Sequence, residues 1–259
     1  MNLKGKSAIV TAAASGVGKT IAELLARQGV SVAIADVSQD AAQSVANAIE
    51  NAGGKAISVA MDVTSEIAVN RATDRVAHVF GGVDILVSNP GVQVVNPVED
   101  YAFADLKKML AIHIGGALHT TKAVLKHMYP NDRGGTVIYM GTVNSYEPSP
   151  LKSVYTAGRL GLLWLARMLA KEGAAHNVRS HVIVRTPLVN RQSPEQTHDL
   201  AIRQEEVVRR EAAGGTVDAI FTTVEETVLY LCEFPSAALS GQSFMVSHGW
   251  FMQQETQVQ

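Results

Sequence analysis

The sequence predicts an α/β fold: a doubly wound, Rossmann-type parallel sheet of about seven strands with helices on both faces. Apolar runs and helical patterns alternate along the chain, with short connections between them. The apolar runs are continuous rather than interrupted by polar residues, as in parallel strands that helices bury on both faces. A glycine-containing turn, Gly16-Val-Gly18, joins the first run to the first helical pattern, as it does in doubly wound sheets.

The expected elements follow one another in chain order. Apolar runs predict strands over Ser7–Val10, Ser31–Ala35, Ala56–Met61, Asp84–Ser88, Thr136–Gly141, Val178–Val184 and Gln242–Val246. Helical patterns predict helices over Val17–Gln28, Ser38–Asn51 (which Gly53-Gly54 stops), Glu66–Phe80, Phe103–Met128, Ser153–His176 and Glu225–Cys232. A charged segment from about Ser193 to Glu211 predicts a helical insertion at about residues 189–212. Because no linker or internal repeat divides the chain, we expect residues 1–259 to form a single domain.

Composition excludes several classes of protein. Of the 259 residues, 47% are hydrophobic and 18% are charged, which excludes a disordered chain. The formal net charge of −2 gives no basic excess, so neither nucleic acid nor a membrane surface is an expected partner. No apolar stretch is long enough to span a membrane and the start carries no signal-peptide core, so we expect a cytoplasmic protein. The one cysteine, Cys232, lies in an apolar run and is expected in the core. The histidines lack metal-ligand spacing, so no metal site is expected.

The ends of the first four strands carry a candidate dinucleotide site. The turn after the first strand lets the backbone approach a diphosphate, and the following helix offers its N-terminal N–H groups. Asp36 ends the second strand, where a carboxylate accepts ribose hydroxyls and repels a 2′-phosphate, so NAD is the expected cofactor. The candidate cofactor residues at these strand ends are Thr11, Ser15, Gly16, Val17, Gly18, Asp36, Asp62, Val63, Asn89 and Gly91. An ordinary strand–helix turn is the alternative interpretation of the glycines.

These motifs, together with Tyr155 at mid-chain, resemble the short-chain dehydrogenase/reductase family over nearly the whole chain. A more specific similarity is to bacterial D-3-hydroxybutyrate dehydrogenases. It rests on Ser149-Pro-Leu-Lys-Ser153, Val184-Arg-Thr-Pro-Leu-Val189, Phe221-Thr-Thr-Val-Glu225 and the string from Phe234 to Trp250. The resemblance implies an NAD-dependent interconversion of a 3-hydroxy acid and a 3-oxo acid.

The resemblance also implies roles for four catalytic positions, three of them altered. Tyr155 matches the tyrosine that exchanges a proton with the substrate oxygen. Arg159 stands in place of the family's lysine, where it keeps the positive charge beside Tyr155 but cannot relay a proton. Thr142 replaces the serine that orients the substrate, and His113 replaces an asparagine. Tyr155, Arg159 and Thr186 also match positions that contact the cofactor in the family.

Other departures affect the cofactor side. Ala12 replaces the first glycine of the nucleotide loop, which costs little at negative φ and more at positive φ. Ser88 and Pro90 depart from the family's Asn-Asn-Ala-Gly motif. After Val184 about four residues that contain the family's Pro-Gly pair are missing, which would pull Thr186 toward the end of the strand.

The substrate side resembles the subfamily more closely. A 3-hydroxy acid needs a cation and hydrogen-bond donors for its carboxylate. Gln93, Lys152 and Gln192 resemble the set that binds this carboxylate in the subfamily. Asn144 stands where the subfamily has a histidine, and Trp250 resembles its C-terminal pocket residue. A solvated surface lysine is the alternative interpretation of Lys152.

Two functions therefore stay open at this point. One is a dehydrogenase of impaired activity that acts on a small hydroxy or oxo acid. The other is a catalytically silent relative that binds a nucleotide or a protein partner without turnover. The family resemblance further implies a homotetramer, with Leu160, Leu163, Trp164 and Met168 as the apolar contact face of the helix Ser153–His176.

Overall fold

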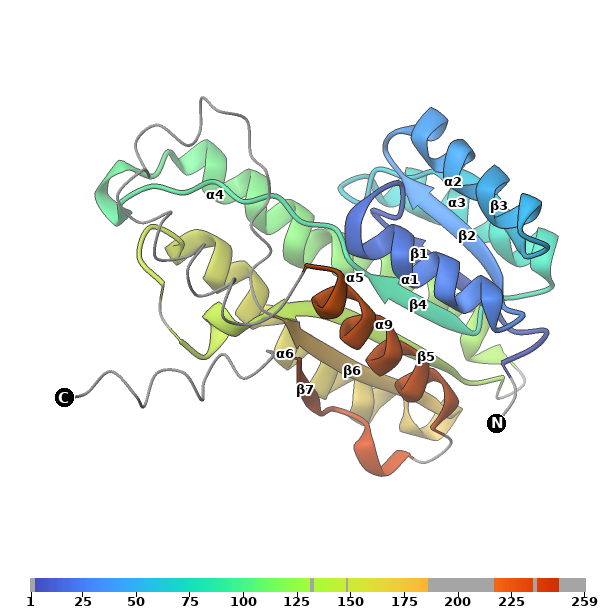
Figure 1. Cartoon of the computed structure of the whole chain (residues 1–259). Coiled ribbons are helices and arrows are strands. Elements are labelled where there is room, and N and C mark those ends of the chain that lie inside the picture. The colour runs from blue at the N-terminus through green and yellow to red at the C-terminus, as the bar shows by residue number, and fades with distance from the viewer. Residues whose placement is uncertain (1–2, 131–132, 148, 186–216, 235–236, 247–259) are drawn as a thin grey trace.

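The computed structural model describes residues 3–130, 133–147, 149–185, 217–234 and 237–246, with only the backbone for 217–223. Seven parallel strands form one sheet in the order β3-β2-β1-β4-β5-β6-β7 (Figure 1). The strands are β1 Ser7–Thr11, β2 Ser31–Asp36, β3 Lys55–Ala60, β4 Ile85–Ser88, β5 Gly135–Thr142, β6 Val178–Arg185 and β7 Ser243–Val246. The predicted doubly wound sheet is confirmed.

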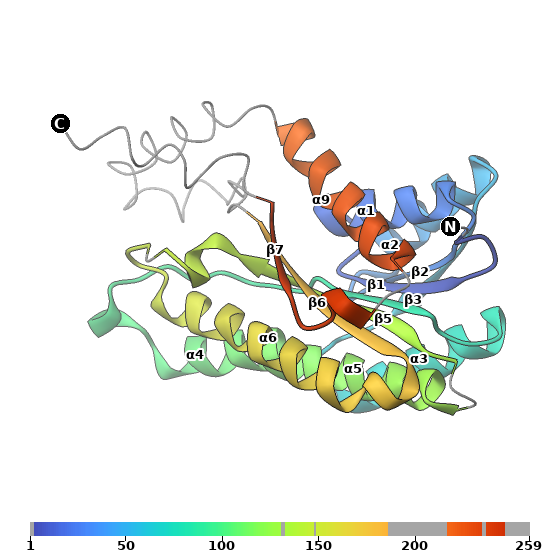
Figure 2. The same cartoon turned by 90° about the horizontal axis from the view of Figure 1, so that it is seen from below.

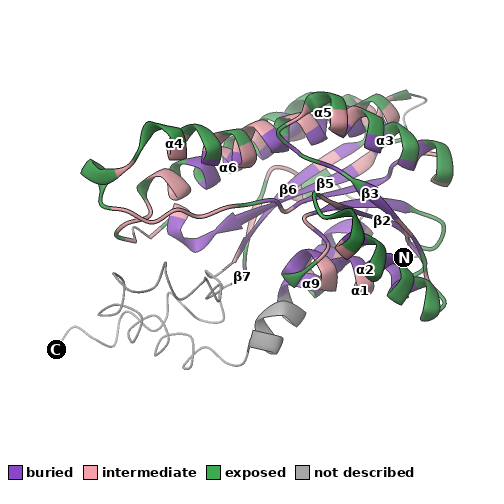
Figure 3. Cartoon of the chain, turned by 90° about the horizontal axis from the view of Figure 1, so that it is seen from above, coloured by how far each residue is buried: buried purple, intermediate pink, exposed green. Residues whose placement is uncertain are grey.

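Helices cover both faces of the sheet. The helices α1 Gly16–Arg27, α2 Gln39–Asn51 and α9 Val217–Glu233 pack on one face (Figure 2). The helices α3 Glu66–Phe80, α4 Phe103–Leu110, α5 Gly116–Met128 and α6 Ser153–Glu172 lie on the other side of the sheet. Each layer has its own apolar core, and the strands between the layers are buried while the outer helix faces are exposed (Figure 3). This burial on both faces explains why the strand sequences are continuously apolar.

The helices differ from the sequence prediction in three places. The predicted helix Ser153–His176 ends at Glu172, and Ala174–His176 form a separate 3-10 turn. The expected helix Phe103–Met128 contains a π-helical turn, Ala111–Gly115, between α4 and α5. The last helix begins at Val217, eight residues before the predicted start at Glu225. The predicted helical insertion at about residues 189–212 lies outside the described residues.

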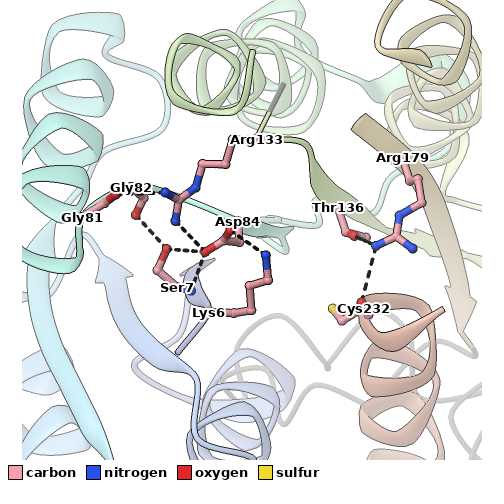
Figure 4. A network of polar contacts seen from close by, with 9 residues as sticks. All are labelled: Lys6, Ser7, Gly81, Gly82, Asp84, Arg133, Thr136, Arg179 and Cys232. Atoms are coloured by element: carbon pink, nitrogen blue, oxygen red, sulfur yellow. Dashed lines mark hydrogen bonds and ion pairs between the residues drawn. The ribbon is translucent and has the colours of Figure 1, made fainter. Parts of the chain in front are cut away.

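The amino-terminal edge of the sheet is held by a buried carboxylate. Asp84 is 4% exposed and accepts hydrogen bonds from the backbone N–H and hydroxyl of Ser7, while Lys6 and Arg133 form ion pairs with it (Figure 4). Burial raises the pKa of Asp84, but the hydrogen bonds from Arg133 and Ser7 outweigh it and leave this pKa below its usual value. This network fixes the starts of β1 and β4 next to each other, and so fixes their carboxyl ends as well.

Exposure along α6 corrects one part of the predicted contact face. Leu160, Trp164 and Met168 are exposed, but Leu163 is only 4% exposed and packs in the core. On a helix, Leu163 is rotated away from the other three, toward the sheet. Cys232 is a buried free thiol, as expected.

No helix within the described ranges is long and apolar enough to cross a membrane. Within the same ranges, no group of three His, Cys, Asp or Glu side chains is arranged to hold a metal ion.

Candidate active site

The candidate site lies at the carboxyl edge of the sheet, where β1 has β2 on one side and β4 on the other. The chain order reverses at this point, which is where doubly wound sheets bind their ligands. The hydroxyl of Thr11, at the end of β1, donates to the carbonyl of Val87 and accepts from the backbone N–H of Asn89 at 2.9 Å. The side chain of Asn89 in turn donates to the carbonyl of Ala12 at 3.4 Å. These bonds join the two loops that border the site.

Glycines are required where the nucleotide loop enters α1. Gly16 has φ +53°, and Gly18 has no room for a side chain because a Cβ would overlap the Ala12 carbonyl and lie 2.9 Å from Nδ2 of Asn89. Ser15 precedes α1 as an exposed residue whose side chain makes no capping hydrogen bond. The backbone N–H groups at the start of α1 are therefore not capped by the side chain that precedes them.

Ala12 has a strained backbone. Its φ is +50°, in the left-handed region that disfavours a residue with a Cβ. The replacement of the family's first loop glycine by Ala12 therefore has the larger energetic cost that is expected at a positive φ.

Asp36 is held in place by backbone hydrogen bonds. Its Oδ2 accepts from the N–H of Ala14 at 3.1 Å, and its Oδ1 accepts from the N–H of Ser38 at 3.0 Å. Asp36 also lines a cavity of about 520 Å³, and the other lining residues at the strand ends are Ala12, Met61, Asp62, Val63, Pro90 and Gly91. The predicted ribose-binding carboxylate and the predicted Asp62-Val63 pair thus face one common space.

A second cavity, of about 240 Å³, brings the nucleotide loop and the catalytic candidates together. Its lining residues are Ala12, Ser15, Gly16, Val17, Asn89, Gly91, Val92, Gln93, Gly141, Thr142, Tyr155, Arg159 and Arg185. Residues from five separate parts of the chain thus border one space.

The phenol of Tyr155 is activated by its surroundings. Burial raises its pKa, but the charges of Arg159 and Arg185 and hydrogen bonds with Arg159 and Thr142 outweigh burial, so the pKa lies below its usual value. The guanidinium carbon of Arg159 lies 5.5 Å from the ring centroid of Tyr155. A tyrosine with a lowered pKa is better able to exchange a proton near neutral pH.

Arg159 is fixed between β5 and the loop after β4. It is 4% exposed, and its Nη1 donates to the carbonyl of Met140 at 2.8 Å. The guanidinium also lies against Gly91, where any Cβ would overlap it. The larger head group of arginine is therefore accommodated because position 91 has no side chain.

His113 lies on the π-helical turn and faces the same group. Its Nε2 is 2.9 Å from the carbonyl oxygen of Val92 and 3.3 Å from the backbone nitrogen of Val92, so it donates to the first or accepts from the second according to the tautomer. Its ring meets that of Tyr155 edge-on at 5.4 Å. Burial, and then the charge of Arg159, lower the pKa of His113 to about 3. His113 is therefore neutral at physiological pH. Its Nδ1 faces Gly158, where a Cβ would lie 2.7 Å away.

Arg185 is the site residue that sequence reasoning missed. It ends β6, paired in register with Thr142 at the end of β5. Burial lowers the pKa of Arg185 to about 10, Tyr155 opposes this shift, and the charge of Arg159 adds to it. The signal was present in the sequence: with about four residues missing after Val184, the strand continues directly into Arg185.

The predicted substrate residues are only partly brought together. Gln93 lines the cavity of about 240 Å³ with Tyr155, whereas Asn144 and Lys152 are not among its lining residues. Asn144 is 5% exposed, and its backbone N–H donates to the hydroxyl of Thr142 at 3.3 Å. Lys152 immediately precedes α6 and is partly buried. The predicted positions Thr186, Gln192 and Trp250 lie outside the described residues.

A nucleotide loop and an activated tyrosine on a doubly wound sheet are features of oxidoreductases that use a dinucleotide. The chain belongs to the short-chain dehydrogenase family, whose model, described as "short chain dehydrogenase", matches residues 6–197. The family uses NAD or NADP. The chain is accordingly a short-chain oxidoreductase by family and by fold.

Its relatives differ in substrate. D-beta-hydroxybutyrate dehydrogenase of Rhizobium meliloti (strain 1021) is 30% identical over 258 residues, which cover 96% of this chain and 99% of the relative. D-threitol dehydrogenase of Mycolicibacterium smegmatis is 33% identical over 181 residues, which cover 70% and 69%. Among solved structures, a gluconate 5-dehydrogenase from Burkholderia cenocepacia in complex with NADP and tartrate has a TM-score of 0.84 at 24% identity, with 97% of both chains covered. That likeness shows the fold alone.

Proposed function

We propose that the protein is an NAD-dependent oxidoreductase that interconverts a 3-hydroxy acid and its 3-oxo acid. The observation that carries this proposal is the position of Tyr155, which borders the same cavity as the nucleotide loop and has a lowered pKa. The similarity to a D-beta-hydroxybutyrate dehydrogenase over 96% of the chain supports the choice of substrate class.

The roles of the side chains follow from their chemistry. A bound nicotinamide dinucleotide would supply or accept the hydride. Tyr155 donates its phenolic proton to the substrate oxygen during reduction and takes one up during oxidation. Thr142, whose hydroxyl hydrogen-bonds with Tyr155, orients that oxygen, and the positive charge of Arg159 favours the phenolate. His113 is a positioning residue: it holds the backbone at Val92 and the edge of the Tyr155 ring, and it is neutral.

The dinucleotide would be held by the residues of the two cavities. The turn from Thr11 to Gly18 offers N–H groups at the start of α1 for the diphosphate. Asp36 would accept from the ribose hydroxyls, and Asp62, Val63, Asn89 and Gly91 would border the remaining parts. The described neighbourhood fits such a group because Gly16, which lines the smaller cavity, has open space where a side chain would lie.

The turnover test uses the substrates that the proposal names. Purified protein should oxidise 3-hydroxybutyrate with NAD, followed by the absorbance of NADH, and Tyr155→Phe should abolish this rate. Tyr146→Phe is the matched control, because Tyr146 is exposed and does not line the cavity. Oxidation of polyols but not of 3-hydroxy acids would refute the substrate class.

The test of the cofactor uses Asp36. NADH should bind more tightly than NADPH in a fluorescence titration, because the carboxylate of Asp36 repels a 2′-phosphate. Asp36→Ala should narrow that difference, whereas Asp40→Ala, an exposed carboxylate in the first turn of α2, should leave it unchanged. A protein that prefers NADPH without any substitution would overturn the assignment.

The second candidate function is a nucleotide-binding relative without turnover. It is favoured by one group of observations: the strain at Ala12, the neutral His113 and the second arginine, Arg185, beside Tyr155. Tight binding of NADH together with no hydride transfer to any 3-oxo acid would establish this candidate over the first.

The proposal includes a homotetramer in the cytoplasm. The exposed apolar residues Leu160, Trp164 and Met168 on α6 support an interface between copies, since such a face is stable when a second copy covers it. A monomer at micromolar concentration in light scattering would refute the assembly.

A further inference from the structure

Two arginines converge on one side of the smaller cavity. Arg159 comes from α6 and Arg185 from the end of β6, and both line the cavity next to Tyr155 and Thr142. The backbone register that pairs Thr142 with Arg185 fixes the position of the second arginine. This position is occupied by an arginine because β6 continues straight into Arg185.

Apart from the phenol of Tyr155, no acidic side chain among the described lining residues balances these two positive charges. The lining of this cavity, as far as the structure describes it, contains no aspartate or glutamate. Nη1 of Arg185 and Nε of Arg159 are buried and lack a hydrogen-bond partner among the described residues. Buried cations without an anionic partner are costly, so a ligand that supplies negative charge and oxygen acceptors would be bound favourably.

We propose that Arg159 and Arg185 form a binding site for the carboxylate of a small organic acid, with the hydroxyls of Thr142 and Tyr155 beside it. The planar, forked donors of arginine match the two oxygens of a carboxylate. The cavity of about 240 Å³ lies below the usual range of sites for drug-sized ligands, about 300–1,000 Å³, and so suits a small acid.

A phosphate has similar charge, and it would have a different position in the same cavity. The start of α1, with Ser15, Gly16 and Val17, borders the cavity and offers backbone N–H groups to a diphosphate. The arginines lie next to Tyr155 instead, where the chemistry of an organic substrate is expected. A carboxylate is therefore the ligand expected at the two arginines, and the binding of pyrophosphate distinguishes it from a phosphate.

This inference rests on the proposed function only for the identity of the acid. It places the carboxylate of that acid on different residues from those that the sequence resemblance implies. The sequence resemblance placed the substrate carboxylate on Gln93, Lys152 and Gln192. Of the two that lie within the described residues, only Gln93 lines the cavity. Arg185 supplies from β6 the cation that Lys152 was expected to supply.

The experiment measures binding, with no dinucleotide present. The full-length protein is titrated with malonate, with its neutral isostere malonamide and with pyrophosphate, by calorimetry. We expect malonate to bind and malonamide not to bind. Arg185→Gln should lower the affinity for malonate by about ten- to a hundredfold, the loss typical of a charge-assisted hydrogen bond. The affinity for pyrophosphate should fall much less in the same variant.

Arg179→Gln is the matched control. Arg179 lies on the same strand at the opposite edge of the sheet, where it donates to the hydroxyl of Thr136 at 2.7 Å, and it also has an unpartnered buried nitrogen. Malonate should bind Arg179→Gln as it binds the unsubstituted protein. Arg185→Lys is a second variant that keeps the charge, and it should lose less affinity than Arg185→Gln because only the fork is removed.

Three results would overturn the proposal. They are an absence of malonate binding, malonate binding that is unchanged in Arg185→Gln, and a dependence of pyrophosphate binding rather than malonate binding on Arg185. Because no hydride transfer is measured, a protein that fails the turnover assay can still bind malonate through Arg185. The failure of the proposed function and the failure of this inference are thus distinguishable.

Discussion

His113 should make the folded protein sensitive to acid. In the folded state burial holds its pKa near about 3, whereas an unfolded histidine has a pKa of about 6.5. Below the unfolded value, the unfolded chain binds a proton that the folded chain does not, so stability falls as the pH falls from about 6.5 toward about 3. Above that window His113 is neutral in both states and contributes no pH dependence.

The magnitude follows from the size of the shift. About pH 5 lies about 1.5 units below the unfolded pKa, and each unit is worth about 1.4 kcal/mol, so about 2 kcal/mol of stability is lost there. That is a large share of the roughly 5–15 kcal/mol that stabilises a typical domain. His113→Asn removes the titrating group. The difference in unfolding free energy between about pH 7.5 and about pH 5 should therefore shrink by about 2 kcal/mol.

Urea denaturation at the two pH values, followed by circular dichroism, measures this difference. Met109→Ala is the matched control: Met109 is fully buried on α4, one turn before His113, and carries no titrating group. It should lower stability at both pH values and leave their difference unchanged. An unchanged pH dependence in His113→Asn would show that His113 is not held neutral, which would refute the reasoning from burial.

Three further substitutions test the loop, the catalytic cation and the assembly. Ala12→Gly should stabilise the protein by up to about 1 kcal/mol in thermal unfolding, since it relieves a left-handed conformation. Ala14 does not have a positive φ, so Ala14→Gly should destabilise the protein. Equal losses of stability in the two variants would exclude backbone strain at Ala12. Arg159→Lys alone should recover little turnover, whereas Arg159→Lys with Cys-Pro-Gly-Phe inserted after Ile183 should recover markedly more; full recovery by the single change would reverse this ranking. Trp164→Glu should dissociate the oligomer in light scattering, because it places charge on an exposed apolar face, and an unchanged mass would move the interface elsewhere.

The strands were predictable from sequence because their signal is local. Each is a short apolar run between turn residues, and each observed strand lies within one or two residues of the prediction. The start of α9 was not predictable in this way. Its first turns, from Val217 to Thr223, contain several β-branched residues, which have weak helix propensity in isolation. The π-helical turn was missed because one inserted residue barely disturbs a helical pattern.

The candidate site divides along a similar line. Residues placed by spacing within one element were predictable: Tyr155 and Arg159 lie four residues apart and share a helix face. Arg185 was missed, because its position depends on how far β6 continues before the chain leaves the sheet, and the shortening after Val184 was the only signal of it. The shortening after Val184 removes the family's Pro-Gly pair, and it also brings the side chain of Arg185 to the site. The sequence pattern shows that the loop is shorter but does not specify which side chain takes its place.

The departures from the family pattern depend on one another. Arg159 lies against the bare backbone of Gly91, and its charge helps to keep His113 neutral. The ring of His113 in turn requires the missing side chain at Gly158. Arg185 adds a second charge on the same phenol, so Tyr155 would retain a cationic neighbour even if Arg159 were removed. Because Arg159 and His113 each fit against a neighbouring glycine, and both carry contacts to Tyr155, restoring one family residue leaves the others shaped for an arginine-rich site. The residues around Tyr155 therefore act as a set, and only combined substitutions can convert the site from one arrangement to the other.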